Sequence, residues 1–131
     1  MILQKNEHII SENADENIIM DELDSAFDGY IILTDEKTGS YIQTMIASGG
    51  YTGIVEARLY DDNKKFKHYG AEISCGDTAE DNMKTVVGGI SVMKKQVIEL
   101  SSVKRIFLYF LKNAGIAPEY VWNEFPKDYF D

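Results

Sequence analysis

The side chains whose types and spacing could carry out chemistry are His68 and the carboxylates of Glu56 and Glu72. An imidazole changes its charge near neutral pH, so a histidine with a carboxylate beside it can act as a general acid/base pair. Charged side chains on a strand are, however, more commonly ordinary cross-strand partners. The sequence therefore leaves two interpretations of His68 open: the centre of a small catalytic or ligand-binding site, or part of a noncatalytic surface.

The expected strands bring further polar residues to the same surface. In the strands predicted at 51–60 and 66–73, the odd-numbered positions are mostly apolar, which indicates that they face the core. A three-residue loop at 48–50 would bring Ile42, Thr44 and Ile46 to the opposite face. A surface that mixes charged, aromatic and aliphatic side chains is typical of protein-binding sites. The candidate contact residues on this face are Glu56, Arg58, Tyr60, His68 and Glu72, with Phe66 beside them.

Other kinds of site are not indicated. Cys75 is the only cysteine and the chain has 2 histidines, so neither a disulfide nor a zinc ligand set is expected, and we interpret Cys75 as a half-buried structural residue. The glycine pairs at 49–50 and 88–89 match no phosphate-binding motif and are typical of turns. The sequence contains none of the common catalytic or calcium-binding motifs. We therefore expect no cofactor and no metal, and binding is favoured over catalysis.

Acidic residues are concentrated at the beginning of the chain. The formal net charge is −9, and residues 1–36 contain ten acidic residues and one basic residue, Lys5, whereas residues 37–131 balance to zero. Binding to phosphate backbones depends on clustered lysine and arginine, so nucleic acid and anionic membranes are disfavoured as partners. An acidic helix face is often simply solvated, but it can also steer a basic partner protein. The candidate contact residues for such steering are Asp21, Glu22 and Asp24.

Caps, periodicity and turns predict the elements that position these residues. Residues 13–27 are expected to form a helix, with Asn13 as the N-cap and Glu16 in the capping-box position. Strands are expected at 30–34, 40–47, 51–60 and 66–73. Their connections are too short for a crossover helix, so these strands are predicted to form an antiparallel meander.

The second half of the chain adds two further strands and a second helix. Strands are expected at 83–87 and 91–100, followed by an amphipathic helix that is capped by Ser101-Ser102 and ends at Gly115. The aromatic segment 118–131 is expected to dock on the core as a short strand or turn. Trp122 is expected to be a core residue or, alternatively, a further anchor for a partner. Residues 1–131 are thus predicted to form one α+β domain: an antiparallel sheet of five to six strands, with an acidic N-terminal helix and a late helix packed on it.

The sequence also bears on location and assembly. No stretch approaches the ~18 apolar residues of a membrane helix, and no signal-peptide pattern opens the chain, so a cytoplasmic protein without a membrane anchor is expected. We expect a monomer or a weak homodimer. Alternatively, exposed Ile42, Ile46 and Ile54 could mediate stable self-association.

Several segments carry a resemblance to a known class of proteins. They are Asp-Gly-Tyr-Ile-Ile-Leu at 28–33, Tyr-Ile-Gln-Thr at 41–44, Glu-Ala-Arg-Leu-Tyr at 56–60, His-Tyr at 68–69 and Val-Trp-Asn-Glu-Phe at 121–125. Their content and order resemble the small α+β immunity proteins of bacterial polymorphic toxin and contact-dependent inhibition systems. The resemblance implies that the chain neutralises a toxin encoded by a neighbouring gene, through tight noncatalytic binding in the cytoplasm. Many such toxins are basic nucleases, to which an acidic inhibitor is electrostatically complementary.

Overall fold

The fold is built on one large antiparallel sheet. The structure is a computed structural model and describes residues 1–25, 29–47, 49–73 and 78–130. The strands follow the order β10-β6-β5-β4-β3-β1-β2, and the short strand β9 pairs with the beginning of β5. Their bounds are β1 (Ile2–Lys5), β2 (His8–Ser11), β3 (Tyr30–Thr34), β4 (Tyr41–Ile46), β5 (Thr52–Tyr60), β6 (Phe66–Glu72), β9 (Ile98–Glu99) and β10 (Val121–Glu124).

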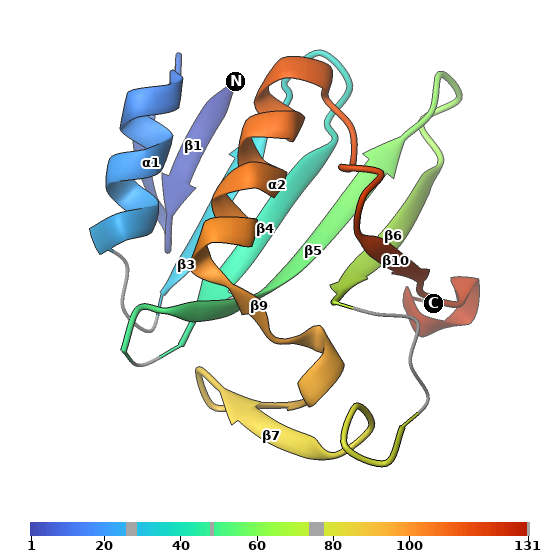
Figure 1. Cartoon of the computed structure of the whole chain (residues 1–131). Helices are drawn as coiled ribbons and strands as arrows, with labels where there is room; N and C mark the ends of the chain where they lie inside the picture. Colours follow the sequence, from blue (N-terminus) through green and yellow to red (C-terminus); the bar gives the residue numbers. More distant parts are fainter. Residues whose placement is uncertain (26–28, 48, 74–77, 131) are drawn as a thin grey trace.

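Two α-helices of the described chain, α1 (Glu16–Ser25) and α2 (Leu100–Asn113), lie on the same face of this sheet (Figure 1). We call this the helix face and the opposite side the outer face. The arrangement confirms the predicted α+β class, the meander of β3 to β6, and the early and late helices. The sheet is larger than expected. The β1–β2 hairpin, which was not predicted, extends it beyond β3.

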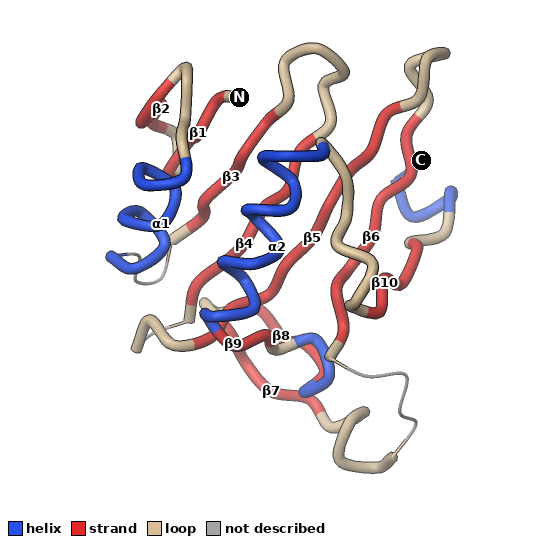
Figure 2. Tube along the Cα trace, turned by 45° about the horizontal axis from the view of Figure 1, so that its top comes forward, coloured by secondary structure: helices blue, strands red, loops and turns tan. Residues whose placement is uncertain are grey.

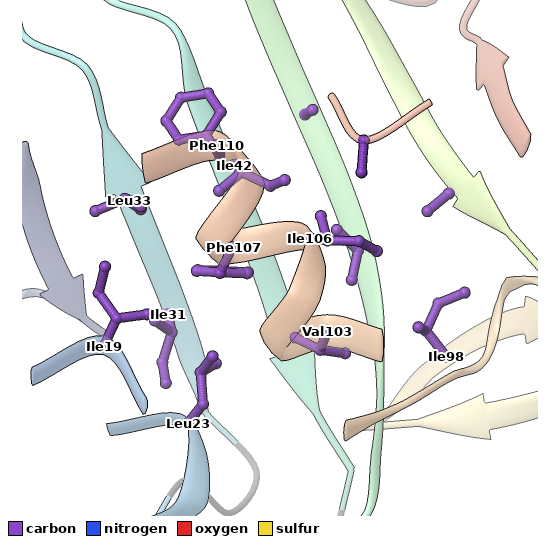
Figure 3. Close-up of a cluster of buried hydrophobic side chains, with 14 of the residues drawn as sticks. Ile19, Leu23, Ile31, Leu33, Ile42, Ile98, Val103, Ile106, Phe107 and Phe110 are labelled. Atoms are coloured by element: carbon purple, nitrogen blue, oxygen red, sulfur yellow. The ribbon is translucent and has the colours of Figure 1, made fainter. Parts of the chain in front are cut away.

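The core fills the space between the helix face and the two helices (Figure 3). Apolar side chains alternate along the central strands and recur at helical spacing along α1 and α2, so both layers present a continuous apolar surface. Burying these side chains is the main favourable contribution to folding. The residues that lie fully buried here include Ile19, Leu23, Ile31, Leu33, Ile42, Val103, Ile106, Phe107 and Phe110.

Helix α1 begins two residues later than its predicted cap implied. The carboxylate Oδ1 of Asp15 accepts the amide N–H of Ile18 at 2.9 Å, so Asp15 caps the first turn. Asn13 is not the cap: its amide N–H donates to Ser11 Oγ at 3.1 Å in the preceding turn. Glu16 is therefore the first helical residue and not the capping-box partner. The predicted end at Phe27 lies outside the described residues.

The segment before α2 also differs from the prediction. The strand expected at 91–100 ends at Met93, and a 3₁₀ turn (Lys94–Gln96) and β9 follow it. Glu99 occupies the N-cap position of α2, so Ser101 and Ser102 lie inside the first turn instead of capping it. At the other end, Ala114 adopts a left-handed conformation with φ 51° and terminates the helix one residue before the expected glycine.

The β4–β5 register overturns one predicted placement. Ile46 pairs with Gly53 and Ile42 with Ala57, which puts Ile42, Thr44 and Ile46 on the helix face. Four residues, 48–51, separate the hydrogen-bonded pair Ala47 and Thr52, instead of the three assumed from the sequence. One additional loop residue reverses the face of every following side chain. Ile42 and Ile46 are consequently fully buried and unavailable for the self-association considered above.

A separate hairpin covers part of the outer face. It consists of β7 (Lys84–Val87) and β8 (Ile90–Met93), which lie at one end of the large sheet (Figure 2). Gly88 and Gly89 connect the two strands with φ values of 57° and 82°, a conformation that favours glycine. Gly88 also packs closely on the sheet, because a Cβ added to it would lie 2.7 Å from Cγ of Met45.

This packing makes the hairpin sensitive to substitution at one of its two glycines. Gly88→Ala is expected to lower the free energy of unfolding by about 1–2 kcal/mol, because it adds a close contact with Met45 to the strain of positive φ. Gly89→Ala is the matched control, since no atom lies within 4 Å of its added Cβ. Urea denaturation of both variants measures the difference, and equal losses would contradict the packing of Gly88 on Met45.

The C-terminal segment docks as a strand, as predicted. β10 pairs with β6, from Val121 opposite Glu72 to Glu124 opposite Tyr69. Trp122 packs against the core, and its indole N–H donates to the carbonyl of Ala117 at 2.8 Å. Trp122 is thus a partly buried residue at the margin of the core. A 3₁₀ turn (Lys127–Phe130) follows β10.

Candidate functional site

His68 lies at the centre of a hydrogen-bonded chain on the outer face. It stands opposite Arg58 in the β5–β6 pairing, and its side chain is only 4% exposed. Arg58 Nε lies 3.2 Å from His68 Nδ1, and Glu56 Oε1 lies 2.6 Å from His68 Nε2. Because a guanidinium can only donate, Nδ1 must accept, and the ring proton on Nε2 is donated to Glu56. Both ring nitrogens therefore have partners.

Aromatic rings surround this chain and restrict its movement. The ring centroids of Tyr41 and Phe125 lie 6.4 Å and 5.0 Å from that of His68, both in edge-to-face orientation. The guanidinium carbon of Arg58 lies 4.0 Å from the ring centroid of Phe66, in a cation–π contact. We call Tyr41, Glu56, Arg58, Phe66, His68 and Phe125 together the Arg58 cluster.

Most of the predicted outer-face residues do meet, but one does not. Glu56, Arg58, Tyr60 and His68 share this face, as expected from the alternation, and Tyr60 packs on Phe66 with ring centroids 5.6 Å apart. Glu72 lies four residues further along β6, about 13 Å from His68 along an extended strand. Its buried carboxylate is 3.8 Å from Nζ of Lys95. Glu72 therefore forms its own ion pair and is not the partner of His68.

The acidic residues of α1 form a second, separate surface. Glu22 is 3.7 Å from Nζ of Lys5, and Asp24 pairs with Lys104 of α2, so two of the three predicted contact residues are partly neutralised. Asp21 is exposed, and among the described residues no basic side chain lies within ion-pair distance of it. Since α1 lies on the helix face and the Arg58 cluster on the outer face, the two surfaces do not form one contiguous site.

Two members of the cluster, Tyr41 and Phe125, were not predicted from the sequence. Tyr41 was not among the predicted residues, because the assumed loop length placed Ile42, Thr44 and Ile46 on the outer face in its stead. Phe125 was recognised only as part of an aromatic segment. It reaches His68 because Gly70, directly beneath it, has no side chain: a Cβ at Gly70 would lie 3.2 Å from the Phe125 ring. The sequence signal for this contact was Gly70 itself, because a glycine inside a strand often marks a place where another group approaches closely.

Comparisons with known proteins do not assign the chain to a family. Its sequence matches no protein-family model, and no curated protein sequence matches it.

The arrangement of the cluster has clear chemical consequences. His68 is buried and hydrogen-bonded through both nitrogens, so it is poorly placed to exchange a proton with a substrate. Glu56 borders a cavity of about 210 Å³ between the β7–β8 hairpin and the C-terminal segment. Among the described residues no group of three or more potential ligands could hold a metal ion, and no helix has the length and apolar character needed to cross a membrane. Cys75 lies outside the described residues.

The environment of Tyr41 predicts a pH dependence of stability. Burial raises the pKa of the Tyr41 phenol above its usual value of 10.0, and the Arg58 guanidinium partly opposes this effect. The folded state therefore holds the phenol proton more tightly than the unfolded state does. The resulting stabilisation is fully present below pH 10.0 and is lost as the pH rises through the folded-state pKa.

We expect Tyr41→Phe to reduce this alkaline loss of stability, because the variant keeps the ring but has no proton to lose. Urea denaturation of both proteins at about pH 8 and about pH 10.5 tests the expectation, since other groups that titrate in this range are common to both. An identical loss in wild type and variant would show that Tyr41 makes no contribution.

Proposed function

We propose that the chain is a noncatalytic immunity protein, which binds a cognate bacterial toxin in the cytoplasm and blocks its activity. The observation that carries the proposal is the fixed position of Arg58. Its guanidinium is held by His68 Nδ1 on one side and stacks on Phe66 on another, and His68 is in turn held by Glu56. Such a chain pre-organises an arginine for binding, which reduces the entropy lost on association.

The composition of the surrounding surface supports the same function. Arginine and tyrosine are the residue types that most often dominate the binding energy of protein interfaces, and Arg58, Tyr41 and Tyr60 occupy adjoining positions on the outer face. All three side chains are half-buried, so their contact surfaces are supported by neighbouring groups. The outer face therefore offers anchors for a partner, and the two ring nitrogens of His68 are occupied by Arg58 and Glu56.

Exposed acidic residues along α1 and near the β1–β2 hairpin, which we call the acidic edge, favour a basic partner. Asp21, Asp24 and Glu16 are exposed along α1, and Glu7 and Glu12 are exposed in and after the neighbouring β1–β2 hairpin. An acidic surface accelerates association with a basic protein and discriminates against acidic ones. A toxin of the basic nuclease type is therefore the partner class that this edge fits.

Coexpression provides the functional test. The chain is expressed together with the toxin domain encoded by the adjacent gene, and growth is compared with that of cells making the toxin alone. Growth rescue is expected, together with a complex that survives size-exclusion chromatography at micromolar concentration. Absence of both rescue and complex would overturn the proposal. A toxin domain inactivated by substitution is the matched control for expression burden.

A further inference from the structure

A second concave site lies beside the Arg58 cluster. A cleft of about 400 Å³ opens between the turn that joins β5 to β6 and the C-terminal segment. This volume is within the range of about 300–1,000 Å³ that is typical of small-molecule sites. Its lining includes three members of the Arg58 cluster, Phe66, His68 and Phe125, and four lysines: Lys64, Lys65, Lys67 and Lys127.

The charge of the cleft is opposite to that of the whole chain. The molecule carries a formal charge of −9, yet the four lysines converge on this cleft from two segments that are far apart in the sequence. The one acidic residue in the lining is Glu124, whose Oε1 lies 3.7 Å from Nζ of Lys67. The remaining lysines give the cleft an excess of positive charge that attracts an anionic group.

The local backbone holds this arrangement in place. The carboxylate Oδ1 of Asp61 accepts the amide N–H groups of Asn63 and Lys65, at 2.8 Å and 3.0 Å, which fixes the shape of the β5–β6 turn. Lys64 occupies a left-handed conformation with φ 61° within that turn. The turn therefore positions the backbones of Lys64 and Lys65, while their side chains are exposed to solvent.

The aromatic part of the lining is also fixed. One face of Phe66 is stacked by Arg58, and Phe125 is held edge-to-face against His68 and Tyr129, with centroid distances of 5.0 Å and 5.2 Å. Fixed rings bordered by cations suit a ligand that combines a planar ring with a negative group. The ring stacks on aromatic surface, and the anion accepts charge-assisted hydrogen bonds from lysine.

We propose that this cleft binds a nucleoside phosphate, with its base against the phenylalanine rings and its phosphate among the lysines. A single nucleotide is favoured over a nucleic acid strand because the four lysines of the cleft could neutralise only a few phosphates of a strand. A nucleotide is favoured over an acidic peptide because its planar base can stack on the rings of Phe66 and Phe125. The cleft shares Phe66, His68 and Phe125 with the Arg58 cluster, but its lysines lie outside that cluster, so their substitution tests nucleotide binding without altering Arg58.

Titration of the full chain followed by amide NMR shifts tests the proposal, with ADP, adenosine and inorganic phosphate as separate probes. ADP is expected to bind in the micromolar to low millimolar range and to shift the amide signals of residues 64–68, Phe125 and Lys127. Adenosine and phosphate are each expected to bind at least about tenfold more weakly, since each provides only half of the contacts. Failure of ADP to bind at millimolar concentration, or equally tight binding of phosphate alone, would overturn the proposal.

Charge removal localises the binding. The double variant Lys65→Gln/Lys127→Gln is expected to weaken ADP binding by about tenfold or more, because charge-assisted hydrogen bonds to phosphate are lost. Lys112→Gln, on the exposed side of α2, is the matched control and is expected to bind as wild type does. Unchanged binding by the double variant would contradict the assignment. Tighter binding of a hexaglutamate peptide than of ADP would overturn it in favour of an acidic peptide.

Discussion

Replacing Phe107 with alanine is expected to lower the free energy of unfolding by about 3–5 kcal/mol, one of the two largest effects we predict. Phe107 is fully buried at the centre of α2, where it contacts the core beneath both helices (Figure 3). Its removal takes away buried apolar surface and leaves a cavity that the rigid sheet cannot close. Denaturant unfolding at neutral pH measures the loss.

Leu108→Ala is the matched control for this prediction. Leu108 is the next residue of the same helix but only half-buried, so its truncation is expected to cost about 1 kcal/mol. The comparison removes the contribution of helix propensity, because both variants introduce alanine at neighbouring positions of α2. Similar losses for the two variants would mean that α2 does not bury the face that contains Phe107.

The second large effect is expected for binding. Arg58→Ala should weaken the complex with the toxin by about 30-fold or more, since truncating a central interface anchor typically costs about 2 kcal/mol or more. The loss should appear mainly as faster dissociation. Surface plasmon resonance with the immobilised toxin domain measures both rates. Thermal unfolding of the free variant shows whether the fold persists without the Arg58–His68 hydrogen bond.

Two further variants separate the contributions of charge and geometry. Arg58→Lys keeps the positive charge but loses the planar group that stacks on Phe66, so it should restore only part of the affinity. Asp21→Asn, on the acidic edge, should slow association at low salt and leave dissociation nearly unchanged. If Arg58→Ala dissociates at the wild-type rate while Asp21→Asn dissociates faster, the principal contact lies on α1 and not on the outer face.

Periodicity and turn residues predicted much of the fold because their signals are local. The alternation of the central strands identified the meander, and the spacing of Val103, Ile106, Phe107 and Phe110 identified the buried face of α2. The cap of α1 was misassigned because Asn13 and Asp15 are both good N-cap residues. In the structure Asp15 accepts the first-turn amide of Ile18, whereas the amide of Asn13 donates to Ser11. Such neighbouring alternatives are hard to separate without a structure.

The candidate site was only partly predictable for a related reason. Alternation within β5 and β6 brought Glu56, Arg58 and His68 together correctly. The position of Tyr41 depended on the length of one loop, where a single residue reverses the face of a strand. The contact between Phe125 and His68 joins residues far apart in the sequence, and no local pattern specifies it.

Stoichiometry provides the most direct test of noncatalytic recognition. Purified toxin domain at a concentration well above the dissociation constant is titrated with the chain, and residual toxin activity is measured after short and long incubation. An inhibitor that acts by binding is expected to abolish activity at one equivalent, with the same titration curve at both times. Progressive inactivation of the toxin by a small fraction of an equivalent would show turnover, and would contradict the conclusion that the Arg58 cluster serves binding instead of catalysis.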